Sequence, residues 1–124
     1  MNKQILIIDD DPRNIFALVA VLHAKHYRCL TATDATEGLK ILFSREDIGI
    51  VLMDMMMPDM DGYQALALIR REPTVASVPV IAVTAQAMAG DREKCMEAGA
   101  NAYISKPIDT DALLNLLKQY LVQI

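Results

Sequence analysis

The 124-residue chain lacks long hydrophobic runs, an excess of positive charge and a signal-peptide pattern, and each absence excludes a class of protein. No apolar run approaches the roughly 20 residues that a transmembrane helix requires. A formal net charge of -4 argues against nucleic-acid binding, because phosphate contacts need clustered lysines and arginines. The first residues lead directly into a strand-like segment rather than a secretion signal. We therefore expect a cytoplasmic domain that binds neither nucleic acid nor membrane.

Cysteines are also few, and no linker, repeat or low-complexity segment divides the chain. Cys29 and Cys95 are far apart and match no metal-binding spacing, so we interpret both as reduced thiols. A length of 124 residues suits one domain with its own core. The sequence thus predicts a single domain over residues 1–124.

Strand-like and helix-like segments alternate five times along the chain. Each predicted strand is a short apolar run of the kind that is buried on both faces of a sheet. The predicted helix over 87–97 contains Gly90 and few large apolar residues, so we expect it to be loosely held. The alternation predicts a doubly wound α/β domain of (βα)5 type, with a parallel sheet covered by helices on both faces. The predicted strands are 4–8, 28–32, 48–53, 78–83 and 102–105.

The candidate chemical residues directly follow four of these five strands. Asp9 and Asp10 follow the first, Asp54 the third, Thr84 the fourth and Lys106 the fifth. The carboxyl ends of parallel strands share one edge of a sheet, which is where ligands bind in open α/β folds. We therefore expect three carboxylates, a hydroxyl and an ammonium group to share one crevice.

Three carboxylates in one crevice need a cation. Two like charges about 4 Å apart repel by roughly 4 kcal/mol at an effective dielectric of 20. Carboxylate oxygens with water suit Mg²⁺, and Mg²⁺ at a strand edge is an arrangement for phosphoryl transfer. Asp54 can then act as a carboxylate nucleophile and form an aspartyl phosphate. Lys106 can pair with a phosphoryl oxygen, and Thr84 can donate a hydrogen bond to another.

Short motifs spread over essentially the whole chain accompany these residues. They are Asp9-Asp10, the segment from Asp54 through Pro58 to Asp61-Gly62, Val83-Thr84-Ala85, Gly99-Ala100 and Lys106-Pro107. Together they resemble the receiver domain of two-component response regulators, such as the chemotaxis regulators. The segments 9–12 and 90–95 look most like the receivers of hybrid histidine kinases.

The resemblance implies a role for each acidic residue. Asp54 would be the phosphoacceptor, and the Asp10 and Asp54 side chains would bind Mg²⁺. Asp9 would act mainly through bound water, and the Met56 carbonyl would be a further metal ligand. The family's strand order, 2-1-3-4-5, is expected for this sheet.

The resemblance also assigns the groups around the phosphoryl group. Thr84 and Lys106 would hold it, and Tyr103 matches the aromatic residue that switches together with the threonine. The Lys106-Pro107 peptide bond would be cis. Met56 and Gln86 are the side chains best placed to orient a hydrolytic water. Neither supplies a carboxylate base, so we expect a persistent phosphoryl mark.

The expected function is therefore that of a switch in a phosphorelay. A histidine kinase or histidine phosphotransfer protein would donate the phosphoryl group, and a downstream output domain or protein would bind the switched face. Such a domain promotes its own phosphorylation and slow dephosphorylation, and we expect it to be a phosphoacceptor switch and not an enzyme.

Two alternatives use similar architecture. A phosphatase of the haloacid dehalogenase type needs a second acid two residues after its nucleophile, where this chain has Met56. A flavodoxin-like FMN carrier needs a phosphate loop rich in Ser, Thr and Gly after the first strand. The run Asp9-Asp10-Asp11 would instead repel a phosphate there.

Overall fold

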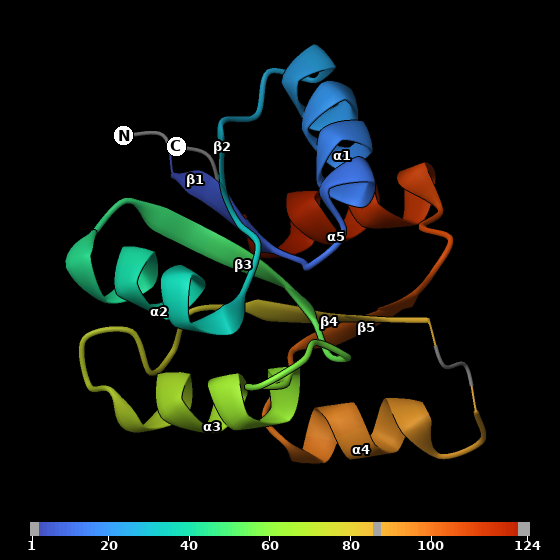
Figure 1. Ribbon diagram of the computed structural model, residues 1–124. Coiled ribbons are helices and arrows are strands. Elements are labelled where there is room, and N and C mark those ends of the chain that lie inside the picture. The colour runs from blue at the N-terminus through green and yellow to red at the C-terminus, as the bar shows by residue number, and fades with distance from the viewer. Residues whose placement is uncertain (1–2, 86–87, 122–124) are drawn as a thin grey trace.

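The computed structural model describes residues 3–85 and 88–121, in which five strands alternate with five helices (Figure 1). The alternation predicted from the sequence is confirmed. The elements are β1 (Gln4–Ile8), α1 (Pro12–Ala24), β2 (Cys29–Ala32), α2 (Ala35–Ser44), β3 (Ile48–Asp54), α3 (Gly62–Arg71), β4 (Val80–Thr84), α4 (Asp91–Glu97), β5 (Ala102–Ser105) and α5 (Thr110–Tyr120).

All five strands are parallel and lie in the order β2-β1-β3-β4-β5, as expected. Helices α1 and α5 cover one face of the sheet, and α2, α3 and α4 cover the other (Figure 1). Alternate residues of a strand point to opposite faces. In β1, Leu6 and Ile8 therefore join the core under α2 and α3, while Ile5 and Ile7 join the core under α1 and α5.

Aspartates begin four of the described helices. Each lies just before the first helical turn, and its carboxylate accepts a hydrogen bond from a backbone N–H that has no partner inside the helix. In α3, Asp61 also forms a reciprocal capping box with Gln64. These caps fix where four of the helices begin, which matters because the candidate site lies in the connections between strands and helices. The capping residues are Asp11, Asp34, Asp61 and Asp109.

Two elements begin more than one residue away from the prediction, and the other strand boundaries agree to within one residue. The fourth helix begins at Asp91, not at residue 87, because Gly90 has a left-handed backbone with φ 84° and cannot continue a right-handed helix. The predicted first residue, Ala87, lies outside the described residues. The fourth strand begins at Val80 rather than Val78, since Pro79 has no N–H to donate to a neighbouring strand.

Among the described parts of the chain, no helix combines the length and hydropathy needed to span a bilayer.

Candidate functional site

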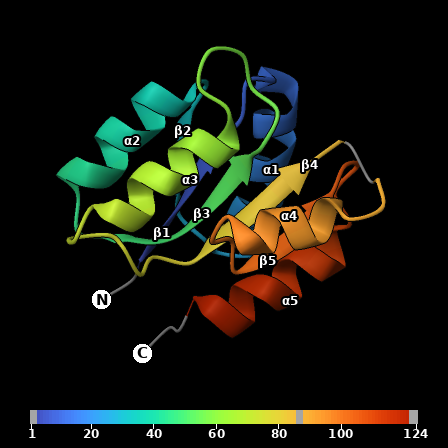
Figure 2. The same ribbon diagram turned by 90° about the horizontal axis from the view of Figure 1, so that it is seen from below.

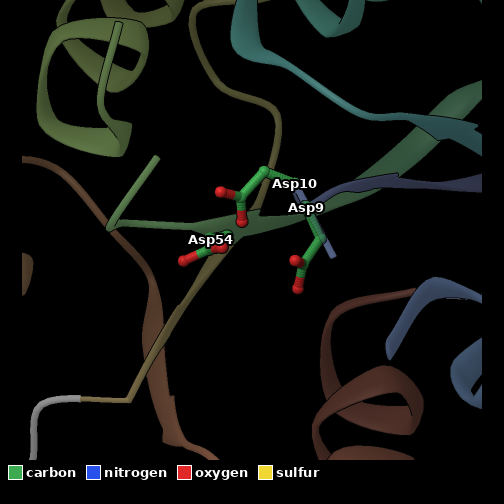
Figure 3. A group of neighbouring side chains, drawn as sticks. All are labelled: Asp9, Asp10 and Asp54. Carbon is green, nitrogen blue, oxygen red and sulfur yellow. The ribbon is translucent and has the colours of Figure 1, made fainter. Parts of the chain in front are cut away.

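Three acidic side chains gather where β1 and β3 end (Figure 3). Asp9 and Asp10 follow β1, and Asp54 is the last residue of the neighbouring strand β3. Each offers a carboxylate oxygen within 4.8 Å of the others. Asp9 and Asp54 are buried, whereas Asp10 is exposed. The predicted convergence of the three carboxylates is confirmed.

Lys106 follows β5, which is an outermost strand of the sheet and two strands away from β3, and its side chain reaches this cluster. Its Nζ lies 3.1 Å from Asp9 Oδ2 and 3.4 Å from Asp54 Oδ2. The Lys106-Pro107 peptide bond is cis, as expected. Burial lowers the pKa of Lys106, but the hydrogen bond that its ammonium group donates to Asp9 and the charges of Asp54 and Asp9 outweigh the effect of burial, so the net pKa is raised. The side chain therefore stays an ammonium ion at neutral pH.

The Asp54 carboxylate has a perturbed acidity. Burial raises its pKa to about 6, and the negative charge of Asp9 adds to this. A hydrogen bond from the Met56 backbone N–H to Asp54 Oδ1, 3.0 Å long, and the charge of Lys106 act in the opposite direction. At neutral pH the carboxylate is mostly ionised, as a nucleophile must be.

Asp9 is held by protein donors. Its Oδ1 accepts a hydrogen bond from the Asp11 backbone N–H at 2.9 Å, and its Oδ2 accepts one from Asn14 Nδ2 at 2.6 Å. Lys106 is the third partner. With its oxygens occupied in this way, Asp9 is suited to contact an ion through water. The sequence reasoning missed Asn14, although its place in the first turn of α1 was the available signal.

Thr84 and Tyr103 lie on adjacent strands. Thr84, the last residue of β4, is buried and pairs in register with Ser105 of β5. Tyr103 is half-buried on β5, and its hydroxyl donates a hydrogen bond to Asp91 at the start of α4, 3.0 Å away. The two residues thus lie on paired strands, as the expected strand order requires, and their roles in switching stay predictions.

Met56 lies next to the acidic cluster. Its backbone N–H bonds to Asp54, and its side chain is 48% exposed. The proposed role of its carbonyl as a metal ligand stays a prediction. Gln86, which was expected to face the same space, lies outside the described residues.

The donor set fits a hard divalent cation. Three carboxylates face one ammonium group, so the cluster carries excess negative charge that a cation neutralises. All its metal-ligating atoms are oxygens, and the exposure of Asp10 leaves room for water ligands, which Mg²⁺ retains. The same charge disfavours the phosphate of a flavin.

Comparison with known proteins agrees with this arrangement. The family model "Response regulator receiver domain" matches residues 5–118. Sensor histidine kinase RcsC of Salmonella typhi is 40% identical over 119 residues, which are 96% of this chain and 12% of that protein. The chain thus spans about an eighth of the length of this curated relative.

Two solved structures share the fold. The receiver domain of sensor histidine kinase PA1611 from Pseudomonas aeruginosa PAO1 is 33% identical with a TM-score of 0.88, covers 98% of each chain, and has a magnesium ion coordinated in its active-site cleft. The receiver domain of Saccharomyces cerevisiae Ssk1, solved with the histidine phosphotransfer protein Ypd1, has a TM-score of 0.89 at 23% identity. That match covers 97% of this chain and 89% of the other.

Proposed function

We infer the roles of the site residues from two premises: this chain belongs to the response regulator receiver domain family, and its carboxylates cluster with Lys106. A receiver domain is a phosphoacceptor of two-component signalling rather than a classical enzyme. We propose that Asp54 accepts the phosphoryl group here. The observation that carries this proposal is the buried Asp54 carboxylate at a strand end, within 4.8 Å of two other carboxylates and 3.4 Å from an ammonium group.

The oxygen donors fit Mg²⁺, which neutralises charge on the phosphoryl oxygens when it is bound. We propose that the side chains of Asp10 and Asp54 and the Met56 carbonyl hold it, with Asp9 acting through water. The magnesium ion in the PA1611 receiver domain supports this assignment.

Three side chains of the protein have separate roles in the transfer of the phosphoryl group. An ionised Asp54 oxygen attacks the phosphorus of a phosphohistidine, so that an O–P bond forms while the P–N bond to the imidazole breaks. Lys106 pairs with a phosphoryl oxygen and leaves Asp9 and Asp54, its present partners. The Thr84 hydroxyl donates a hydrogen bond to a second phosphoryl oxygen. The product is one acyl phosphate per chain.

Receiver domains interact with histidine kinases and with histidine phosphotransfer proteins, of which Ypd1 is an example. We propose that a phosphohistidine of this class is the donor, that the domain extends over residues 1–124, and that it works in the cytoplasm within a phosphorelay. The match to RcsC supports a hybrid histidine kinase as its source. A downstream output domain or protein would bind the face of α4, β5 and α5 after Thr84 and Tyr103 rearrange.

Phosphorylation with a small donor tests the assignment of Asp54. We expect intact mass spectrometry after incubation with acetyl phosphate and Mg²⁺ to show one added phosphoryl group on the wild type. Asp54→Asn should take up none. Asp59→Asn, which removes an exposed carboxylate from the same loop, is the matched control and should behave as the wild type. Equal uptake by Asp54→Asn would refute the assignment.

A further inference from the structure

Helix α4 has few anchors of its own. It has only seven residues, and Gly90 at its N-terminus provides no side-chain cap. Cys95 is its one buried residue. The position of such a helix depends on the side chains that reach it from neighbouring elements.

Tyr63 reaches α4 from the first turn of α3, on the same face of the sheet (Figure 2). Its hydroxyl lies 3.4 Å from Cys95 Sγ, within hydrogen-bonding distance for sulfur. The Lys94 ammonium group lies 4.6 Å from the centre of the Tyr63 ring, in the range of a cation–π contact. Burial, followed by the contact with Cys95, raises the pKa of the Tyr63 phenol, which therefore stays protonated and able to donate. One side chain thus holds two successive residues of α4.

The other end of this connection lies at the candidate phosphoacceptor. Gly62, the residue before Tyr63, packs directly on the backbone of β3 and its following loop. A Cβ at Gly62 would lie 2.6 Å from Met55 Cα and 2.9 Å from Asp54 O. The Gly62 N–H also donates a hydrogen bond to Met55 O at 3.2 Å. A displacement of the Asp54 backbone is therefore transmitted to Tyr63 without an intervening flexible segment.

We propose that Tyr63 is a positioning residue that couples the Asp54 loop to α4, holds α4 in its resting position and thereby opposes phosphorylation. This inference rests on the proposed function of Asp54. The route runs through α3 and uses neither Thr84 nor Tyr103. On this proposal phosphorylation displaces α4. Because linked equilibria are reciprocal, a change that frees α4 must then also favour the phosphorylated state of Asp54.

Tyr63→Phe tests the coupling with minimal change, since the ring and its contact with Lys94 remain. Loss of one hydrogen bond should increase amide exchange of residues 91–98 about fivefold in the unphosphorylated protein. The ratio of phosphorylated to unphosphorylated chains, measured at limiting acetyl phosphate, should rise by up to the same factor. Tyr120→Phe is the matched control, because it removes a tyrosine hydroxyl that bonds to Asn101 O, 3.0 Å away, on the other face of the sheet. It should leave both quantities unchanged.

A second variant, Cys95→Ala, distinguishes loss of the contact between Tyr63 and Cys95 from general destabilisation. In Cys95→Ala, which lacks the sulfur partner, adding Tyr63→Phe should produce no further increase in exchange or uptake. The inference is overturned if Tyr63→Phe matches the wild type in both measurements, or if exchange rises while uptake is unchanged. Failure of the proposed function is recognised separately, because Asp54→Asn would then still take up the phosphoryl group.

Discussion

Asp54→Asn should stabilise the metal-free protein at neutral pH. Burial raises the pKa of Asp54 to about 6 from an ordinary value of 3.8, so the folded state holds this proton more tightly than the unfolded state does. The difference of about 2 units corresponds to a cost of about 3 kcal/mol for folding with Asp54 ionised. Asparagine has nearly the same shape and carries no charge, so the substitution removes this cost.

The sign of the effect fixes its pH window. Between about pH 4 and pH 6 the native state binds a proton that the unfolded state has lost, so the free energy of unfolding falls as the pH rises. Above about pH 7 the whole cost is present, and near pH 4 it is absent. The stability advantage of Asp54→Asn should therefore be close to zero near pH 4 and level off at about 3 kcal/mol above pH 7.

Urea unfolding in EDTA across this pH range measures the advantage directly, with Asp59→Asn as the control for loss of an exposed carboxylate. In millimolar Mg²⁺ the stability advantage of Asp54→Asn over the wild type should become smaller or change sign. Binding to the folded state alone adds about 2.7 kcal/mol at a hundredfold excess over Kd, and the wild type has the fuller ligand set. If Asp54→Asn is no more stable than the wild type in EDTA at neutral pH, or its advantage does not vary with pH, the electrostatic reasoning is wrong.

Three further predictions concern the metal, the fold and the phosphoryl lifetime. Asp10→Ala should remove most of the rise in melting temperature that Mg²⁺ causes in the wild type, and an unchanged rise would exclude Asp10 as a ligand. Arg70→Met should lower the free energy of unfolding in urea by about 2–4 kcal/mol, because it leaves several backbone carbonyls without their donor. Arg71→Met, at an exposed neighbour, should cost far less. Met56→Asn combined with Gln86→Glu should shorten the lifetime of the acyl phosphate, because these side chains can orient and deprotonate a water; radiolabel decay as slow as in the wild type would contradict this.

The fold could be predicted because a buried strand is recognisable from its own consecutive residues. Strands such as 48–53 read as continuous apolar runs, and each is followed by a polar residue at the same sheet edge. The site was predictable for the same reason, since Asp54 and Lys106 directly follow strands. The parallel arrangement alone then brings them together, although 52 residues separate them in the chain.

Contacts between side chains of different elements could not be predicted, because no local sequence pattern marks the residues that make them. Arg70 donates hydrogen bonds to the carbonyls of Ala76, Val78 and Gly99 and to Asn101 Oδ1, which joins α3 to two loops. In the sequence it is one of several charged residues near the end of a helix, and nothing local distinguishes it from Arg71. The same holds for the contact between Tyr63 and Cys95.

The start of α4 shows a conflict between local signals. The alanines and the methionine before Gly90 favour a helix, which led the prediction to begin it at residue 87. Glycine also permits a left-handed backbone, and the chain uses that conformation at Gly90. Propensity alone does not decide between the two outcomes.

The most direct test of the central claim is to locate the acyl phosphate in the chain. Borohydride converts an aspartyl phosphate to homoserine, and peptide mass spectrometry then identifies the modified position. After treatment with acetyl phosphate and Mg²⁺, the account predicts homoserine at Asp54 and at no other aspartate. Homoserine at Asp9 or Asp10, or an unmodified Asp54 in protein that carries a phosphoryl group, would contradict it.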